Sequence, residues 1–257
     1  MAVPAVVLAG GVTKGDLYEA CWVQETALVE IAGKPMVRYV VDALAAAQTV
    51  GEILVVGFER VAQALADTPA RFTPAGETIL DNVMRGIDGL STPAAGAEGQ
   101  DYVLLSTCDL PLLTAEAVDR FVRASLDTGA QFCYPVIARE VCLEKYPEAQ
   151  RTWVKVRDGE FTGGNLVLAS RKFLKDNRAA ILSFFEARKS PLKLALRIGP
   201  VFLLKLALRV ASIAEVERRA GKMFNCTARA IICPDPEVGM DVDKAADLEL
   251  ARRVLEG

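Results

Sequence analysis

The chain opens with Val3-Pro4-Ala5-Val6-Val7-Leu8-Ala9-Gly10-Gly11, a short apolar run that ends in two glycines. An apolar run of this length without polar alternation is typical of a strand buried on both faces of a parallel sheet. Glycines directly after such a strand let the backbone approach a ligand and point N–H groups at an anion. The stretch therefore predicts a buried first strand followed by a glycine turn, which by itself is compatible with an ordinary turn or with one that binds phosphate.

Strand-like and helix-like segments alternate along the first two-thirds of the chain and return at its end. We expect strands at Val3–Ala9, Glu52–Gly57, Arg71–Thr73, Tyr102–Ser106, Gln131–Ile137, Trp153–Val156, Glu160–Ala169 and Ala228–Cys233, and helices at Pro35–Gln48, Glu59–Ala66, Glu77–Leu90, from Thr114 onward and at Ala245–Leu255. This alternation predicts an α/β fold with a largely parallel sheet.

A second motif, Cys108-Asp109-Leu110-Pro111, directly follows the strand expected at Tyr102–Ser106. Ligands of open α/β sheets bind beyond the carboxyl ends of the strands, so this motif and the glycine turn are expected to meet at one edge. Asp109 is the leading candidate for a metal ligand, because hard cations such as Mg²⁺ take oxygen ligands. The alternative interpretation is an ordinary aspartate in a loop or near a helix start.

The composition excludes several kinds of chemistry. The chain has 257 residues and no histidine, which removes Ser-His-Asp and Cys-His triads and histidine-ligated zinc. A formal net charge of −3 argues against general nucleic-acid binding. Any reaction must therefore depend on carboxylates, lysine or arginine side chains and backbone amides, with or without a bound metal.

The same composition bears on where the protein works. Its six cysteines form no Cys-x-x-Cys pair and are interpreted as reduced thiols of a cytoplasmic protein. The first residues lack the basic segment of a signal peptide, and no uncharged stretch reaches the ~18 residues of a membrane span. We therefore expect a cytoplasmic protein without a transmembrane helix.

The segment Arg171–Phe224 differs from the rest of the chain. It carries 13 lysine or arginine residues against 4 aspartate or glutamate residues, and its leucines follow a helical pattern. We interpret it as a basic helical insert at about 171–224 within a single domain spanning 1–257. A lid over an anionic acceptor, a homodimer surface, a peripheral membrane contact and a merely solvated sub-domain are all compatible with this pattern.

Three motifs together resemble those of the MobA-like nucleotidyltransferases, which include the molybdenum-cofactor guanylyl- and cytidylyltransferases. They are Leu8-Ala9-Gly10-Gly11, Gly33-Lys34-Pro35-Met36 and Cys108-Asp109-Leu110-Pro111, and the resemblance covers about Val3–Ala169 and Ile231–Arg252. It implies a Rossmann-like, three-layer (GT-A-like) fold with a mixed, mostly parallel sheet. It also implies transfer of NMP from an NTP to a small phosphorylated acceptor, with release of pyrophosphate.

The resemblance also implies roles for individual residues. In such proteins the glycine turn wraps the triphosphate of the NTP, and Mg²⁺ is held by a carboxylate at the position of Asp109. The second ligand would come from Gly239-Met240-Asp241-Val242-Asp243, where we favour Asp243 and place Asp241 second. The competing interpretation is that Asp243 only caps the following helix.

Two further segments resemble substrate-contacting parts of the family. Gly76 and Asn82 lie in a stretch like the one that reads the nucleotide base, although a helix start with an ordinary surface asparagine is equally compatible. Gly164 and Asn165 match a Gly-Asn pair on the acceptor side, where two glycines inside a strand can instead mark a bulge. Neither the base nor the acceptor is specified by these residues.

The glycine turn departs from the family pattern after its first four residues. The usual loop reads LAGGxSxRxGxxK, whereas this chain offers only Lys14 before Gly15 and has Thr26 where a later lysine is expected. A hydroxyl in place of an ammonium loses charge assistance to phosphate, so Lys14 is the basic residue assigned a catalytic role. The resemblance implies that Lys34 mainly shapes the start of its helix; the alternative is a phosphate contact, by which Lys34 would compensate for Thr26.

Two other functions remain open at this point. The missing lysine at Thr26 would suit a non-catalytic nucleotide-binding protein on the same fold. A sugar-nucleotide glycosyltransferase would need an Asp-x-Asp element after a central strand; Asp109-Leu110-Pro111 is not one, and Asp241-Val242-Asp243 lies at the end of the chain.

Overall fold

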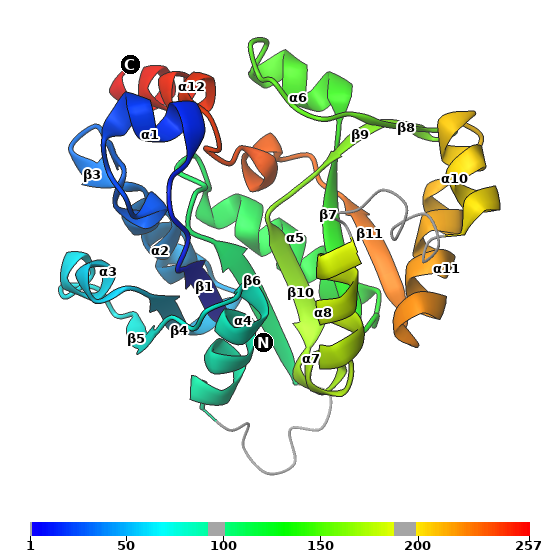
Figure 1. Ribbon diagram of the computed structural model, residues 1–257, viewed down its shortest axis with the longest axis horizontal. Helices are drawn as coiled ribbons and strands as arrows, with labels where there is room; N and C mark the ends of the chain where they lie inside the picture. The colour runs from blue at the N-terminus through cyan, green and yellow to red at the C-terminus, as the bar shows by residue number, and fades with distance from the viewer. Residues whose placement is uncertain (1, 92–100, 188–198) are drawn as a thin grey trace.

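A single mixed sheet forms the centre of the protein (Figure 1). The computed structural model describes residues 2–91, 101–187 and 199–257. Within them the strands run in the order β5-β4-β1-β6-β10-β7-β9-β8, and β11 pairs with β7. The strands are β1 (Val3–Ala9), β4 (Val50–Gly57), β5 (Arg71–Pro74), β6 (Tyr102–Thr107), β7 (Phe132–Ala138), β8 (Val154–Val156), β9 (Gly159–Gly163), β10 (Leu166–Ser170) and β11 (Ala228–Ile232), with a separate hairpin of β2 (Glu30–Ile31) and β3 (Lys34–Pro35).

Helices cover both faces of this sheet, which gives three layers. They are α1 (Gly15–Cys21), α2 (Met36–Ala46), α3 (Glu59–Ala64), α4 (Ile79–Gly89), α5 (Ala115–Asp127), α6 (Arg139–Lys145) and α12 (Ala245–Glu256), with short 3-10 helices η1 (Thr26–Leu28) and η2 (Pro236–Gly239). Along β1 the side chains alternate: Ala5 and Val7 lie in one core with residues of α2 and α5, and Val6 lies in the other with residues of α4. The predicted α/β fold with a mixed sheet is confirmed.

The parallel part of the sheet positions both sequence motifs. β1 pairs in parallel with β4 on one side and with β6 on the other, and the β1–β6 register places Leu8 opposite Thr107. Gly10 and Asp109 each lie two residues beyond this pair. The glycine turn and the acidic motif therefore leave the same edge of the sheet from neighbouring strands.

The expectation of one continuous strand at Glu160–Ala169 is wrong, because this segment forms two strands, β9 and β10. Gly163 of β9 pairs with Val136 of β7, and Leu168 of β10 pairs with Cys133 of β7. The five residue steps from Gly163 to Leu168 therefore lie opposite only three residue steps of β7. The two extra residues are Gly164 and Asn165. The interruption arises because two adjacent glycines weaken a strand and permit a bulge.

The described part of the basic segment 171–224 consists of helices joined by short turns. They are α7 (Arg171–Asp176), α8 (Arg178–Ala187), α10 (Pro200–Ala207) and α11 (Ile213–Phe224), and residues 188–198 of the expected insert lie outside the described residues. No helix among the described residues is long and apolar enough to cross a membrane.

Candidate nucleotide and metal site

The glycine turn packs against the start of α4. A Cβ atom added at Gly10 would lie 2.8 Å from Asn82 Nδ2 and 2.9 Å from the Cβ of Ala75. The buried Asn82 accepts a hydrogen bond of 2.6 Å at Oδ1 from the backbone N–H of Gly76. The structure thus brings Gly10, Gly76 and Asn82 together, and only glycine fits at the first of these positions without moving the asparagine.

The segment that precedes η1 runs beside the glycine turn. Thr13 N donates to Gln24 O at 2.9 Å, and Thr26 N donates to Gly11 O at 3.2 Å. Thr26 therefore lies next to the turn, where the family resemblance placed a lysine. Lys14 is exposed just before α1 and forms no salt bridge with the described residues, so its ammonium group is available to an anion.

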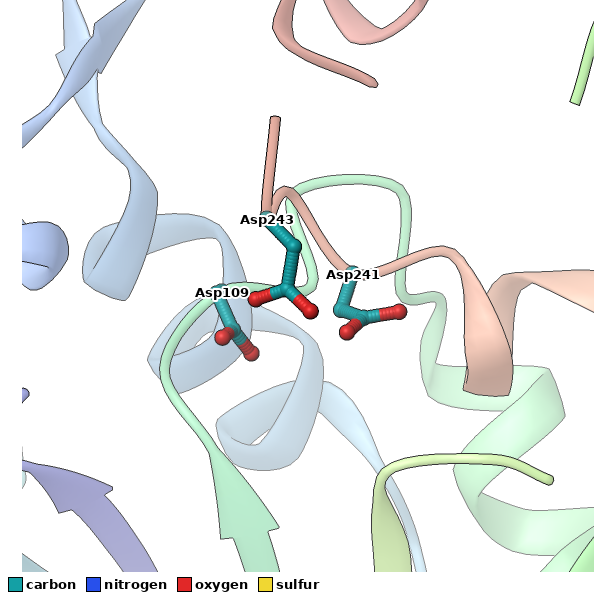
Figure 2. A group of neighbouring side chains, drawn as sticks. All are labelled: Asp109, Asp241 and Asp243. Carbon is teal, nitrogen blue, oxygen red and sulfur yellow. The ribbon is translucent and has the colours of Figure 1, made fainter. Parts of the chain in front are cut away.

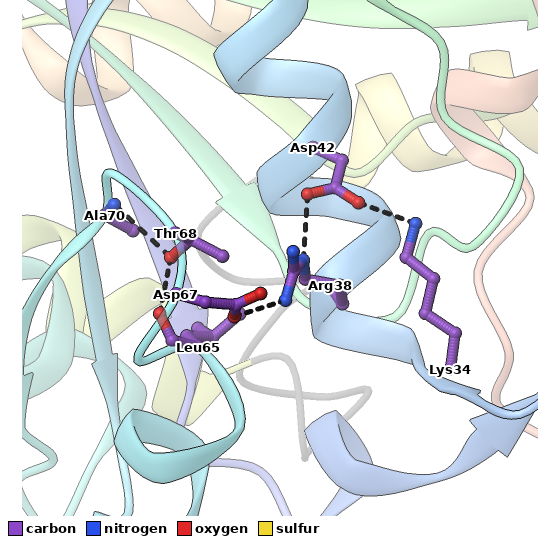
Figure 3. Close-up of polar contacts among 7 residues, drawn as sticks. All are labelled: Lys34, Arg38, Asp42, Leu65, Asp67, Thr68 and Ala70. Carbon is purple, nitrogen blue, oxygen red and sulfur yellow. Dashed lines mark hydrogen bonds and ion pairs between the residues drawn. The ribbon is translucent and has the colours of Figure 1, made fainter.

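Lys34 takes part in a local ion-pair network on α2 (Figure 3). Its Nζ lies 2.6 Å from Asp42 Oδ2 and 4.3 Å from the centre of the Tyr39 ring. Asp42 also accepts from Arg38 Nε at 3.0 Å, and Arg38 Nη1 lies 2.6 Å from Asp67 Oδ1. These contacts agree with the interpretation that Lys34 shapes the start of its helix.

Three carboxylates converge beyond the end of β6 (Figure 2). Asp109 follows β6, and Asp241 and Asp243 lie in the segment between η2 and α12. One oxygen of each carboxylate lies within 4.8 Å of the others. The backbone N–H of Val242 donates to Asp109 O at 3.0 Å, and this bond places the two flanking aspartates beside the third.

The electrostatics of this cluster are unfavourable without a cation. Asp109 Oδ1 is buried and has no hydrogen-bond partner among the described residues. Burial, followed by the charges of Asp241 and Asp243, raises the pKa of Asp109 to about 7. Loss of hydration and the charge of Asp241 likewise raise the pKa of Asp243. An oxygen-only ligand set with an unpartnered buried oxygen fits a hard divalent cation such as Mg²⁺.

Arg151, which the sequence did not single out, holds the Asp241 side of the cluster. Its side chain is only 9% exposed and forms an ion pair through Nη1 with Asp241 Oδ1. Its Nη2 donates to the Asp241 carbonyl at 2.7 Å and lies 3.8 Å from Asp247 Oδ1. Ninety positions separate the arginine from Asp241, so no local pattern could have revealed this contact.

The first turn of α12 bears on the two interpretations of Asp243, because the N-cap residue of this helix is Lys244. The carboxylate of Asp247 accepts from the backbone N–H groups of Asp243 at 3.2 Å and Lys244 at 3.0 Å. Asp247, at the third position of α12, thus accepts from the N-cap residue Lys244 and from the residue before it, as in a capping box. The Asp243 carboxylate points instead into the acidic cluster, as Figure 2 shows.

Gly164 and Asn165 lie at the same edge of the sheet as the acidic cluster. Asn165 N donates to Val238 O at 2.7 Å, and Asn165 O accepts from Thr107 N at 3.3 Å, two residues before Asp109. A Cβ atom at Gly164 would lie 2.8 Å from Val238 O, so close packing against the backbone is enough to explain a glycine at this position. The Asn165 side chain is partly exposed, and its carboxamide forms no hydrogen bond with another described residue.

Tyr134 is a further residue near the site that the sequence did not indicate. It projects from β7 against Gly163, where a Cβ atom would collide with its hydroxyl group. Burial, and then the charge of Asp241, raises the pKa of Tyr134. The residue is still 37% exposed and packs beside the bulge at Gly163.

Comparison with known proteins gives the class. The family described as "MobA-like NTP transferase domain" matches residues 5–197. The chain belongs to this family and is a nucleotidyltransferase, which confirms the predicted family and enzyme class. Comparison with curated proteins gave no match.

Solved structures support the same assignment. A hypothetical transferase from Thermus thermophilus is 37% identical, with a TM-score of 0.83, and the alignment covers 96% of this chain and 100% of the other. CMP:2-keto-3-deoxy-manno-octonic acid synthetase in complex with CTP is 14% identical, with a TM-score of 0.62 over 99% of this chain and 98% of the other. A nucleotidyl transferase from Methanothermobacter is 16% identical, with a TM-score of 0.56 over 99% and 98%. The last two similarities show the fold.

Proposed function

We propose that this nucleotidyltransferase transfers NMP from an NTP to a small phosphorylated acceptor in a Mg²⁺-dependent reaction. The observation that carries the proposal is the position of the Asp109, Asp241 and Asp243 carboxylates. They converge, with one buried oxygen unpartnered among the described residues, beyond the strand next to the one that carries the glycine turn. A cation site beside a phosphate-binding turn is the arrangement that nucleotidyl transfer requires.

The metal would be held by Asp109 and Asp243, with Asp241 as a third carboxylate oriented by Arg151. When bound, Mg²⁺ neutralises charge on the phosphates of the NTP. No histidine is present in the sequence to act as a base, so the protein contributes mainly positioning and electrostatics.

The remaining residues have separate tasks in this proposal. The backbone N–H groups of Gly10 and Gly11 face the triphosphate, and Lys14 supplies a positive charge that Thr26 does not. The corner formed by Gly76 and Asn82 contacts the base. An oxygen of the acceptor phosphate attacks the α-phosphorus of the NTP, the bond to the β-phosphate oxygen breaks, and pyrophosphate leaves.

The acceptor would approach from the side of the bulge. Asn165 offers a partly exposed side chain whose carboxamide forms no hydrogen bond with another described residue, and Gly164 lets the chain pass close to η2. Both residues lie beside the end of β6, which carries Asp109. An acceptor bound here would therefore adjoin the phosphates of the NTP.

The proposal is tested by incubating the protein with each NTP in turn, Mg²⁺ and a pool of phosphorylated metabolites, and by measuring release of pyrophosphate. We expect release with at least one NTP and its loss when EDTA removes the metal. Nucleotide binding without pyrophosphate release under any of these conditions would contradict the proposal and favour a non-catalytic nucleotide-binding protein.

A further inference from the structure

Helix α10 presents apolar side chains to solvent. Leu204 and Leu208, one turn apart, are 58% and 62% exposed, and Val210 just beyond the helix is 52% exposed. Phe202 and Leu206, on the opposite face, are partly buried. Large apolar side chains that gather on one solvent-facing helix surface mark an interaction site more often than single exposed residues do.

This face belongs to a well-anchored helix. The turn after α10 is buried at Ala211, whose carbonyl accepts from Arg157 N at 2.8 Å. Ile213 N donates to Asp158 Oδ2 at 2.9 Å, and Lys205 Nζ pairs with Glu215 Oε1 at 2.6 Å. The corner of α10 and α11 is therefore fastened to the turn between β8 and β9, at the edge of the molecule in Figure 1.

Basic side chains accompany the exposed leucines. Four cations on and after α10 form no salt bridge with the described residues: Arg209, Arg218, Arg219 and Lys222. The two carboxylates of α11 are already paired, Glu215 with Lys205 and Glu217 with Arg229. Helices α10 and α11 together thus combine exposed apolar area with an excess of positive charge.

The amino-acid sequence repeats the same alternation. The hexapeptide Leu204-Lys205-Leu206-Ala207-Leu208-Arg209, at the end of α10, is identical to Leu192-Lys193-Leu194-Ala195-Leu196-Arg197. The earlier copy lies outside the described residues, and the exposed leucines belong to the later copy.

We propose that the exposed face of α10, together with Arg209 and the cations of α11, docks on the surface of an anionic lipid bilayer. Leucine side chains partition into the boundary between headgroups and acyl chains, and neighbouring arginine and lysine side chains are attracted to anionic headgroups. Long basic side chains can reach the headgroups while their stems stay on apolar surface. The inference is independent of the proposed NTP and acceptor.

The test is co-sedimentation of the full chain with vesicles of phosphatidylcholine alone, or of equal parts phosphatidylcholine and phosphatidylglycerol. We expect binding to the anionic vesicles only, and weaker binding at high salt. The double substitution Leu204→Ala and Leu208→Ala should weaken binding at least about tenfold, since it removes much of the exposed apolar area. Val254→Ala, a similarly exposed apolar residue on α12, is the control and should leave binding unchanged.

A second variant tests the contribution of the basic side chains to vesicle binding. Arg209→Gln with Lys222→Gln leaves the leucines in place and should weaken binding to the anionic vesicles, with unchanged thermal unfolding. The proposal is overturned if the wild type stays in solution with anionic vesicles, or if the leucine variant sediments like the wild type. It is also overturned if light scattering shows that the wild type is a dimer, the leucine variant is a monomer, and neither protein binds vesicles. The exposed face of α10 would then join two copies of the chain.

Discussion

The glycine corner, Gly10 with Gly76 and Asn82, and the acidic corner, Asp109 with Asp241 and Asp243, are built in opposite ways. Both stand at the same edge of the sheet, beyond the paired positions Leu8 and Thr107. The glycine corner depends on close packing, since a single added carbon would collide with Asn82. The acidic corner depends on charge, since it collects carboxylates and leaves one buried oxygen without a partner in the described part of the chain.

This difference predicts which substitutions should weaken nucleotide binding and which should weaken metal binding. In the glycine corner, Asn82 Oδ1 already accepts a hydrogen bond from the backbone N–H of Gly76, and the three residues pack closely. In the acidic corner, negative charge exceeds positive charge, because the buried Arg151 pairs with Asp241 and not with Asp109 or Asp243. Steric changes should therefore act on nucleotide binding and packing, whereas charge changes should act on metal binding and turnover.

The largest effect is expected for Asp109→Asn. The amide keeps the shape of the side chain but removes its charge as a metal ligand, so turnover at saturating NTP and Mg²⁺ should fall by about a hundredfold or more. Pyrophosphate release measures this directly. Asp88→Asn, which alters an exposed carboxylate paired with Lys175, is the control. Unchanged turnover in the Asp109 variant would remove this residue from the site.

Arg151→Met should have the next largest effect. Methionine retains apolar bulk but leaves Asp241 and Asp247 without their shared partner, so apparent Mg²⁺ affinity should drop by about 10- to 100-fold. The free energy of unfolding should fall by about 3 kcal/mol, since breaking a buried ion pair leaves an uncompensated charge. Arg151→Lys should recover part of the metal affinity. Loss of stability without any change in Mg²⁺ dependence would show a purely structural arginine.

A smaller effect is expected for Gly10→Ala. Its methyl group would meet Asn82 Nδ2 at 2.8 Å, so the asparagine must move, and overpacking should cost about 1–3 kcal/mol of unfolding free energy. The KM for NTP should rise about tenfold, with little change in Mg²⁺ affinity. Gly11→Ala is the packing control, because its Cβ would meet only Thr26 Oγ1 at an ordinary 3.7 Å. Equal thermal unfolding of all three proteins would show that the glycine corner is not sterically closed.

The smallest effect concerns pH and the metal-free protein. The folded-state pKa of Asp109 is raised from 3.8 to about 7. Between these values the folded state binds more protons than the unfolded state, so the contribution of Asp109 to stability falls as pH rises through this window. In EDTA, Asp109 should therefore lower the unfolding temperature as the pH rises from about 4 to about 7, and Asp109→Asn should lack this decrease. Added Mg²⁺ should stabilise the wild type more at the higher pH, because it competes with protons for the carboxylates. Equal stabilisation by Mg²⁺ at both pH values would argue against a site at Asp109.

Much of this arrangement could be predicted because its signals are local. The apolar run of β1 and the Thr114 side chain, which accepts from Ala117 N at 3.2 Å at the start of α5, form where the sequence indicates. The meeting of Gly10 and Asp109 at one edge follows from the parallel pairing of their strands. Strand periodicity and capping depend on neighbouring residues, so they can be recognised without the fold.

By itself, the amino-acid sequence determined the α/β layers, the glycine turn and the acidic residue after the next strand of the sheet. Only the tertiary structure decided that Asp241 joins the cluster, that Arg151 holds it, and that Lys244 rather than Asp243 is the N-cap residue of α12. It also decided that Gly164 and Asn165 break one expected strand into β9 and β10. The physical reason is distance along the chain: packing and charge pairing join segments that no short-range pattern connects.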